Sequence, residues 1–356
     1  MGFVVSKGTV LVTGATGFIA GHCIEELITH GYAVRGTVRD PATADVAHLR
    51  EVAERTGGAF EVVRASLDAD AGWAEAVAGC TAVWHVASPN PPSAPRTEDE
   101  VVRPAVDGTV RVLRAAAASG TVRRVVLTSS IDAIRHDHGT AGQVFTEEDW
   151  PDASGAGAYP KSKVLAERAA WAIAREHGLE LVAVNPGLVL GPLQRPMHTT
   201  SAEVIRLLLS RGMPAVPRLG FAVVDVRDVA RAHRLAMETP AAAGNRYIVA
   251  GEHRWMEEIA AVLAAEFGPQ GYRVPTARMP RWLMWTVARF DRTIRLALGY
   301  VGVPALVSAE KAAGELGWTP RPAKESIVEM ADSLIRHGIV RPGRPARNGP
   351  ARQSVS

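Results

Sequence analysis

The chain has 356 residues, of which 47% are hydrophobic and 22% charged, an ordinary composition for a globular protein with a large core. Its net charge is +3, but the segment from Arg341 to Ser356 holds four arginines and no acidic residue. The rest of the chain therefore carries a charge of −1, which argues against a nucleic acid as partner. We expect residues 341–356 to form a disordered basic tail.

The two cysteines, Cys23 and Cys80, are too few for a disulfide framework and indicate a reducing compartment. The sequence shows no cluster of metal ligands, no secretory pattern and no run of 18 apolar residues. We therefore expect a cytoplasmic protein without a metal site and without a membrane span.

Short β-branched runs alternate with helical patterns through the first half of the chain. The predicted strands are Thr9–Thr13, Ala33–Val38, Phe60–Ala65, Ala82–Val86, Arg124–Thr128 and Leu181–Asn185. The predicted helices are Phe18–His30, Asp45–Arg55, Gly72–Val77, Glu98–Ser119 and Tyr159–His177. This alternation predicts an α/β fold with a doubly wound parallel sheet of the Rossmann type. The strands are nearly all apolar, as expected when helices cover both faces.

After Pro186 the pattern becomes mostly helical, with short strands expected near Ala222–Val224 and Tyr247–Val249. We interpret residues 1–186 as a nucleotide-binding domain to which some later segments return, and residues 187–340 as a smaller, mostly helical C-terminal substrate lobe. The aromatic segment Arg281–Tyr300 fits a helix that covers a substrate pocket or a partner subunit, or one that lies on a membrane surface.

A glycine-rich turn joins the first predicted strand to the first predicted helix, with the sequence T-G-A-T-G-F-I-A from Thr13 to Ala20. Such a turn needs glycine to let a pyrophosphate approach the backbone, and the N–H groups and dipole of the helix then face the anion. The motif predicts a dinucleotide site. Its cofactor-binding residues would be Gly14, Thr16, Gly17, Phe18 and Ile19.

The second predicted strand ends at Arg39 and Asp40. An arginine at this place pairs with the 2′-phosphate of NADP, whereas an acid accepts hydrogen bonds from the ribose of NAD. Asp40, followed by Pro41, either serves such a ribose or forms a turn that caps the next helix. We therefore expect NADP(H) as the preferred cofactor and NAD(H) as the alternative.

Tyr159 and Lys163 lie four residues apart on a predicted helix and so share one face. A neighbouring ammonium stabilises a phenolate, so we expect the pKa of Tyr159 to be lowered toward the range of a general acid/base. The fifth predicted strand runs into Ser129 and Ser130, at the sheet edge where ligands bind. A hydroxyl there can orient a carbonyl group, and the combination predicts an enzyme that transfers a hydride.

Together these motifs resemble those of the extended short-chain dehydrogenase/reductases. The resemblance is closest to the branch of dihydroflavonol reductases, cinnamoyl-CoA reductases and yeast-type methylglyoxal or aldehyde reductases. It covers about residues 8–338 and rests on Val12–Ala20, Arg35–Pro41, Val83–Pro89, Leu127–Ser130, Tyr159–Trp171, Asn185–Pro192 and Val224–His233. It implies a Rossmann fold and an NAD(P)-dependent oxidoreductase that acts on alcohol or carbonyl groups.

The resemblance also implies residue roles. Ser130 would be the catalytic serine, with Ser129 as the alternative, and Tyr159 the acid/base. Lys163 would hold the nicotinamide ribose, and both Tyr159 and Lys163 would contact the cofactor. The further cofactor contacts implied are Val86, Ala87, Ser88, Pro186, Gly187, Leu188 and Val189, and Ser88 would also face the substrate.

The chain departs from the family pattern at two places. Members usually carry Asp before Leu at the end of the third strand, touching adenine; Ser66 stands there instead, which leaves Leu67 as the candidate contact. Flavonoid reductases carry Asn five residues after the catalytic serine, where this chain has Arg135. That difference argues against a flavonoid substrate. Arg135 is either an anion contact for the substrate or an exposed loop charge.

The resulting hypothesis is an NADPH-dependent reductase of an aldehyde or ketone, acting on a small carbonyl or alcohol compound as a monomer or homodimer. The alternatives are a 3-beta-hydroxysteroid dehydrogenase-like enzyme, a sugar-nucleotide epimerase or dehydratase, and an NADP-sensing protein without activity. Sugar-nucleotide dehydratases carry Thr-Asp-Glu where this chain has Thr128-Ser129-Ser130, and sugar enzymes favour Gly at the place of Pro160.

Overall fold

The computed structural model describes residues 7–89, 97–135, 142–154, 156–287, 289 and 298–342. Within them, the larger sheet has seven strands in the order β3-β2-β1-β4-β5-β6-β9, and each neighbouring pair is parallel. The strands are β1 (Thr9–Val12), β2 (Ala33–Val38), β3 (Phe60–Arg64), β4 (Ala82–His85), β5 (Arg124–Thr128), β6 (Glu180–Pro186) and β9 (Arg246–Val249). The predicted doubly wound parallel sheet is confirmed.

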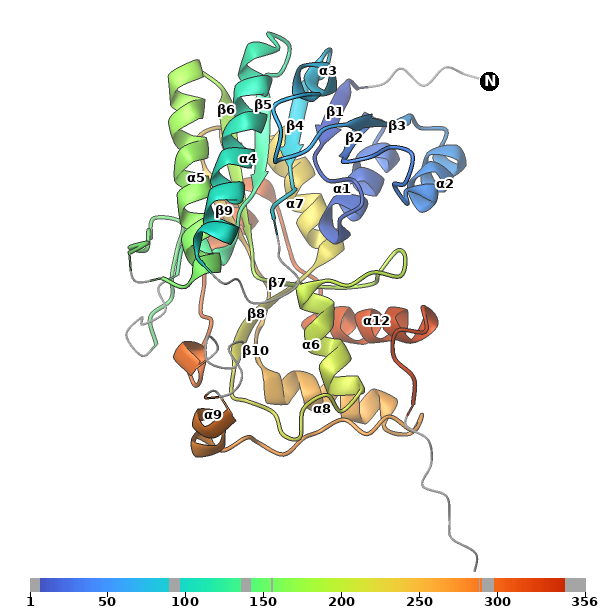
Figure 1. The fold of residues 1–356 in the computed structure, drawn as a ribbon, viewed down its shortest axis with the longest axis vertical. Helices are drawn as coiled ribbons and strands as arrows, with labels where there is room; N and C mark the ends of the chain where they lie inside the picture. The colour runs from blue at the N-terminus through green and yellow to red at the C-terminus, as the bar shows by residue number, and fades with distance from the viewer. Residues whose placement is uncertain are drawn as a thin grey trace, which may run out of the picture.

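Helices cover both faces of this sheet (Figure 1). They are α1 (Phe18–Thr29), α2 (Ala47–Thr56), α3 (Trp73–Val77), α4 (Asp99–Ala118), α5 (Ala158–His177) and α7 (Val226–Glu238). Leu11 and Val125 lie in one apolar core with α3, α4 and α5, whereas Val10 and Val126 lie in a second core with α1, α2 and α7. Successive residues of a strand face opposite sides, so each strand supplies both cores.

A smaller lobe lies below the main sheet in the view of Figure 1. Its strands are β7 (Leu188–Leu190), β8 (Gly220–Asp225) and β10 (His253–Trp255), in the order β10-β8-β7. Helices of this region are α6 (Thr200–Leu209), α8 (Met256–Phe267), α9 (Arg281–Val287) and α12 (Ala323–Arg336), whereas α11 (Glu310–Leu316) packs against β9 and α7. Short 3-10 turns are η1 (Ile131–Ala133), η2 (Pro240–Ala242) and η3 (Leu298–Tyr300). The residue pattern does not predict β7 or β10, because three residues are too few to show alternation.

The chain crosses between the two lobes more than once. It leaves the main sheet after β6, forms β7, α6 and β8, returns through α7 to β9, and leaves again at β10. β9 pairs with β6. The edge strand of the main sheet therefore comes from residues that follow part of the smaller lobe in the sequence.

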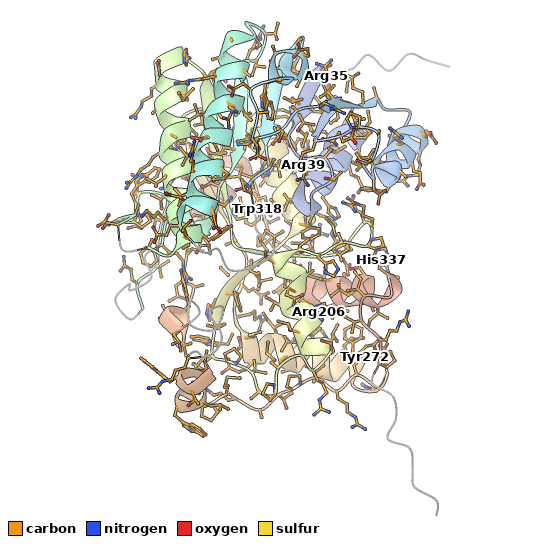
Figure 2. The ribbon with its side chains drawn as sticks, viewed as in Figure 1. Arg35, Arg39, Arg206, Tyr272, Trp318 and His337 are labelled. Atoms are coloured by element: carbon orange, nitrogen blue, oxygen red, sulfur yellow. The ribbon has the colours of Figure 1, made fainter. Side chains whose placement is uncertain are left out.

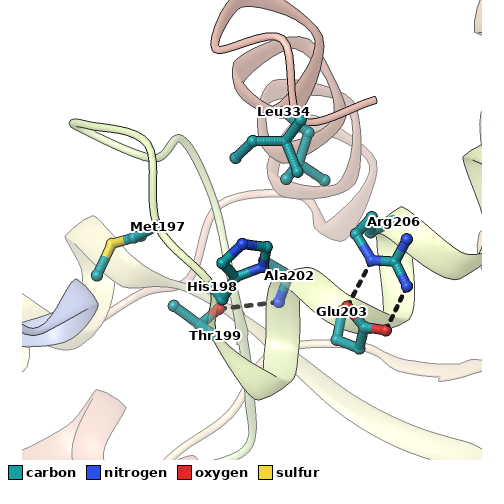
Figure 3. Close-up of a pocket in the computed structure, with 8 residues that line it drawn as sticks. Met197, His198, Thr199, Ala202, Glu203, Arg206 and Leu334 are labelled. Carbon is teal, nitrogen blue, oxygen red and sulfur yellow. Dashed lines mark hydrogen bonds and ion pairs between the residues drawn. The ribbon is translucent and has the colours of Figure 1, made fainter. Parts of the chain in front are cut away.

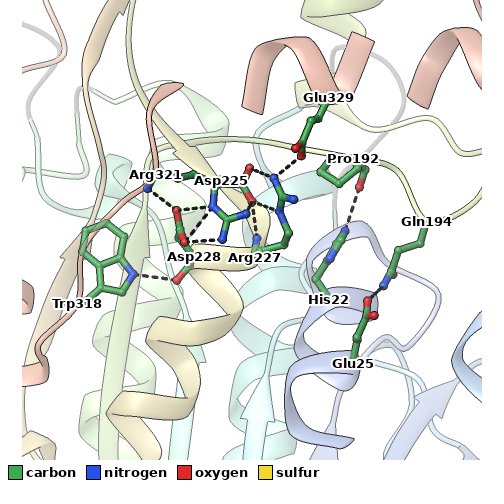
Figure 4. Close-up of polar contacts among 10 residues, drawn as sticks. All are labelled: His22, Glu25, Pro192, Gln194, Asp225, Arg227, Asp228, Trp318, Arg321 and Glu329. Carbon is green, nitrogen blue, oxygen red and sulfur yellow. Dashed lines mark hydrogen bonds and ion pairs between the residues drawn. The ribbon is translucent and has the colours of Figure 1, made fainter. Parts of the chain in front are cut away.

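An ion-pair network fixes the C-terminal segment to α7 (Figure 4). Asp225 caps the start of α7 and binds Arg227, whose Nε lies 2.8 Å from its Oδ1, and Arg227 also pairs with Glu329 of α12. Asp228 accepts a hydrogen bond from the backbone N–H of Arg321 at 2.7 Å. Both aspartates are buried, so their charges depend on these arginines.

The aromatic segment after Arg281 begins as the short helix α9. Met284 is buried, whereas Trp282 and Trp285 are 69% and 64% exposed. Residue 288 and residues 290–297 of this segment, and residues 343–356 of the expected basic tail, lie outside the described part of the chain. Among the described residues, no helix combines the length and the apolarity needed to cross a membrane.

Candidate functional site

The glycine-rich turn has the shape that a dinucleotide needs. Gly14 has a φ of +72°, and a Cβ atom on it would lie 2.9 Å from the Cβ of Ala87. Gly17 is the N-cap of α1, and no side chain caps this helix. The N–H groups of the first turn, which holds Phe18 and Ile19, are therefore available to an anion. The turn fits the pyrophosphate of a dinucleotide.

A buried hydrogen-bond chain holds the strand ends around this turn, and sequence reasoning missed it. The Oγ1 of Thr13 accepts hydrogen bonds from the N–H groups of Val86 and Ala87, at 3.0 and 2.9 Å. Its own proton therefore goes to Nδ1 of His85, 3.0 Å away. Burial lowers the pKa of His85 to about 3, so the ring is neutral and its Nε2–H donates to Thr109. The chain ties β1, β4 and α4 together.

Arg39 and Asp40 have different surroundings at the end of β2. Asp40 accepts hydrogen bonds from the backbone N–H of Ala42, from the hydroxyl of Thr43 and from Arg64, at 3.3, 3.1 and 2.9 Å. The first two bonds hold the pKa of Asp40 below its usual value. Asp40 thus forms the expected turn, but it does not cap the next helix, because the N-cap of α2 is Val46. Arg39 is exposed, has no hydrogen bond within the described residues, and lies at the end of β2 that faces the smaller lobe (Figure 2).

A second cation reaches the glycine-rich turn from the segment after β7. The Nη2 of Arg195 donates a 2.5 Å hydrogen bond to the carbonyl oxygen of Thr16, and its Nη1 lies 3.5 Å from Oδ2 of Asp45. His48 is beside it, and burial, followed by the charge of Arg195, lowers the pKa of His48. Arg195 sits in an irregular loop, so no periodic pattern or motif signals it in the sequence.

Ser130, Tyr159 and Lys163 come together at the carboxyl edge of the main sheet. Ser130 follows β5 and caps η1: its Oγ accepts from the N–H of Asp132 at 3.1 Å and donates to Oδ2 of Asp132 at 3.2 Å. Ser130 also acts on the phenol of Tyr159, whose pKa it lowers. Lys163 lies one helical turn beyond Tyr159 on α5, with Nζ 5.7 Å from the centre of the Tyr159 ring. The structure thus brings these three expected residues together.

The pKa of Tyr159 shifts in the direction opposite to the one expected from the sequence. Tyr159 as a whole is 41% exposed, yet burial around its phenol raises the pKa of this group. The charge of Asp132 raises that pKa further, and Ser130, which lowers it, only partly offsets both effects. Burial lowers the pKa of Lys163 to about 8, against the charges of Asp132 and Glu167. Near neutral pH, Tyr159 is therefore protonated and Lys163 mostly charged.

A buried polar network lies one turn further along α5. Glu167 accepts hydrogen bonds from the hydroxyl of Ser129 at 2.5 Å, from Nδ2 of Asn185 at 2.9 Å and from Nε of Arg246 at 2.6 Å. All four residues are at least 94% buried. Asn185 also donates to the carbonyl oxygen of Ser130. The hydroxyl of Ser129, the alternative catalytic serine, is thus occupied by Glu167, and the network holds the ends of β5, β6 and β9 under the site.

The segment from β6 to β7 passes very close to β8. A Cβ atom on Gly187 would lie 2.0 Å from the carbonyl oxygen of Ala222, so only glycine fits between Pro186 and Leu188. Val189, next in the chain, is buried in the core, whereas Leu188 is only partly buried.

The other expected cofactor residues lie at the ends of β3 and β4. Val86, Ala87 and Ser88 are half-buried after β4. Leu67 lies against Gly108 of α4: a Cβ atom added to Gly108 would be 2.9 Å from the Cβ of Leu67. Arg111 also donates a 2.6 Å hydrogen bond to the carbonyl oxygen of Leu67. The backbone at Leu67 is thereby fixed to α4.

Arg135 is buried, with only 8% of its surface exposed. This finding rules out the alternative of an exposed loop charge.

Two hollows lined by described residues lie away from Ser130 and Tyr159. One, which is too shallow to hold a water molecule, is formed by Met197, Thr199, the Glu203–Arg206 ion pair and Leu334, among others (Figure 3). The other, of ≈550 Å³, lies between α1, α7 and the end of α12. No group of three or more metal-ligating side chains occurs among the described residues.

Comparisons with known proteins agree with this geometry. The model of the NAD dependent epimerase/dehydratase family matches residues 10–251, from β1 to just past β9. Cinnamoyl-CoA reductase 1 of Arabidopsis thaliana is 39% identical over 277 residues, which cover 75% of this chain and 77% of that protein. The chain belongs to this family. Its members are the extended short-chain dehydrogenase/reductases, and this one is an NAD(P)-dependent oxidoreductase.

Further similarities place this short-chain dehydrogenase/reductase among the reductases of the family. Dihydroflavonol 4-reductase of Zea mays is 36% identical over 281 residues, covering 76% of each chain. The NADPH complex of yeast methylglyoxal/isovaleraldehyde reductase superposes with a TM-score of 0.75 at 29% identity, covering 93% of this chain and 100% of that one. The resemblance stated from the sequence is confirmed.

Proposed function

We propose that this enzyme reduces an aldehyde or ketone with NADPH, and that Tyr159 donates a proton to the carbonyl oxygen. The observation that carries the proposal is the convergence of Tyr159, Ser130 and Lys163 at the sheet edge that also holds the glycine-rich turn. The names of the relatives support it, since they include a cinnamoyl-CoA reductase and a methylglyoxal/isovaleraldehyde reductase bound to NADPH.

When bound, the nicotinamide supplies the hydride, and the side chains of this chain manage the negative charge that develops on the oxygen. Because the pKa of Tyr159 is raised, its phenol remains protonated and can act as the acid. Ser130 orients the carbonyl oxygen by a hydrogen bond. Lys163 is mostly charged at neutral pH and stabilises the phenolate that remains after the proton has left.

For the cofactor, we propose NADP(H) in preference to NAD(H). The guanidinium of Arg39 has no hydrogen bond among the described residues and can pair with a 2′-phosphate. Asp40 is held in its turn by Ala42 and Thr43 and is therefore not oriented toward a ribose. Arg195 adds a second positive charge beside the turn that binds the pyrophosphate.

The test is to follow NADPH absorbance with a panel of aldehydes, ketones and steroids. We expect oxidation of NADPH by at least one aldehyde or ketone, and a loss of about 10²–10⁴-fold in turnover with Tyr159→Phe at unchanged NADPH affinity. Tyr32→Phe is the matched control, since the Tyr32 hydroxyl binds Glu238 on the opposite face of the sheet. Tight NADPH binding without turnover of any compound would indicate a sensor. Full turnover by Tyr159→Phe would assign the proton to another group.

A further inference from the structure

Arg135 carries a positive charge that the described residues do not neutralise. Its side chain is 92% buried, and its Nε atom has no hydrogen-bond partner within the described part of the chain. No acidic side chain of the described residues forms an ion pair with it. Burying a charge is unfavourable unless an opposite charge or hydrogen bonds compensate for it. The position is therefore suited to an anion that the described residues do not supply.

Arg135 lies at the junction between the strand end that bears Ser130 and the smaller lobe. Its backbone N–H donates to the carbonyl oxygen of Ile131 at 2.9 Å, which completes the turn that Ser130 caps. Ile131 and Ile134 pack in one apolar cluster with Ala222 of β8. The segment from Ser130 to Arg135 thus leads directly from the serine proposed to orient the carbonyl to the smaller lobe.

An aromatic ring of the smaller lobe lies near this guanidinium. Its Cζ atom lies 5.7 Å from the centre of the Tyr300 ring. The charge of Arg135 also acts on His253 at the start of β10, whose pKa is lowered mainly by burial. The Nε2 of His253 is buried and, like Nε of Arg135, has no partner among the described residues. Gly220 leaves room for this ring, because a Cβ atom there would lie 2.7 Å from Nε2.

The charges of three arginines lower the pKa of His253, and these arginines differ in whether a carboxylate pairs with them. Arg218 lies 3.6 Å from a carboxylate oxygen of Glu257, and Arg254 pairs with Glu252. Arg135 is the one of the three without a carboxylate within the described ranges. The unbalanced charge is therefore at Arg135, and it acts on a histidine whose lowered pKa favours the neutral ring, which can donate a hydrogen bond.

We propose that Arg135 and His253 bind a carboxylate of the substrate, so that the preferred substrates are aldehydes or ketones that also carry a carboxylate group. A guanidinium recognises a carboxylate through two parallel N–H···O bonds, and His253 supplies a further donor. The ring of Tyr300 lies close enough to the same guanidinium for a cation–π interaction. This inference rests on the proposed carbonyl reduction and adds the substrate class to it.

The experiment compares each acid with its amide, which has nearly the same shape but no charge. The pairs are 4-formylbenzoate with 4-formylbenzamide, and 4-oxobutanoate with 4-oxobutanamide, each reduced with NADPH. We expect kcat/KM of the wild type to favour the acid by about tenfold or more in at least one pair. In Arg135→Met this ratio should fall to about one, and Arg135→Lys should restore part of it. Arg218→Met, which removes a paired arginine nearby, should leave the ratio unchanged.

A second measurement separates failure of this inference from failure of the proposed function. Benzoate binding to the NADPH-loaded protein is measured by calorimetry for the wild type and Arg135→Met, with NADPH affinity as the check of folding. Amides reduced at least as well as acids by the wild type would overturn the carboxylate site and leave carbonyl reduction intact. Benzoate bound by the wild type but not by Arg135→Met, without reduction of any compound, would support the site and overturn carbonyl reduction.

Discussion

Asp132 accepts a hydrogen bond from the hydroxyl of Ser130 at 3.2 Å, and its charge raises the pKa values of both Tyr159 and Lys163. Removing that charge should therefore lower both pKa values. Reduction needs protonated Tyr159 and charged Lys163, so its rate falls as the pH rises through these pKa values. We predict that Asp132→Asn shifts the alkaline limb of the kcat/KM profile to lower pH. An unshifted limb would contradict the role of Asp132, and Asp70→Asn, an exposed and distant change, is the control.

Glu167 should be essential to stability. It is fully buried and binds the 6% exposed Arg246, so Glu167→Gln leaves a buried guanidinium without its counter-charge. We predict a loss of about 3 kcal/mol or more in the free energy of unfolding, measured with urea. Glu98→Gln breaks the exposed pair with Lys161 and should cost less than about 1 kcal/mol. Equal costs for the two changes would show that the network contributes little.

Changing Gly14 or Gly57 to Ala distinguishes the cost of backbone strain from the effect of a steric clash. Both have positive φ, +72° and +67°, but only at Gly14 would an added Cβ atom have a neighbour within 4 Å. Each change to Ala should destabilise the protein by about 1–2 kcal/mol. Only Gly14→Ala should also weaken NADPH binding, because the new methyl group meets Ala87 beside the pyrophosphate turn. Fluorescence titration with NADPH and thermal unfolding measure the two effects, and equal NADPH affinities would argue against a cofactor at this turn.

Arg39 should determine the choice between NADPH and NADH. Hydrogen bonds to a charged group contribute about 1.5–3 kcal/mol, which corresponds to roughly tenfold or more in affinity. We predict that Arg39→Gln lowers kcat/KM with NADPH by at least about tenfold and changes that with NADH little. Arg35→Gln is the control on the same strand, since Arg35 is already bound to Glu61 at 2.5 Å. A similar loss with both cofactors would mean that Arg39 does not contact the 2′-phosphate.

The repeating parts of the fold could be predicted from the sequence. The predicted strand Ala33–Val38 is confirmed residue for residue, and the five predicted helices agree with α1 to α5 within one or two residues at each end. Apolar runs bounded by turns give this information locally. The strands β7 and β10 could not be predicted, because short strands depend on partners that are distant in sequence.

The candidate site shows the same division. Gly14, Ser130, Tyr159 and Lys163 belong to motifs with fixed local spacing, and the structure brings them together. The predicted direction of the Tyr159 pKa shift is wrong, because the shift depends on burial and on Asp132 rather than on the helical spacing to Lys163. The network around Glu167, and the approach of Arg195 to the glycine-rich turn, join residues from separate elements and have no local signature.

The return of the chain to β9 has a consequence for engineering. β9 completes the main sheet beside β6, yet in the sequence it comes between β8 and β10, which both belong to the smaller lobe. A fragment that stops after β6 would lose α7 and β9 and expose the edge of β6 to aggregation. Grafting the smaller lobe of a relative onto this enzyme therefore requires at least two exchanged segments, one on each side of α7 and β9, with the Asp225–Arg227–Glu329 contacts kept at the seam.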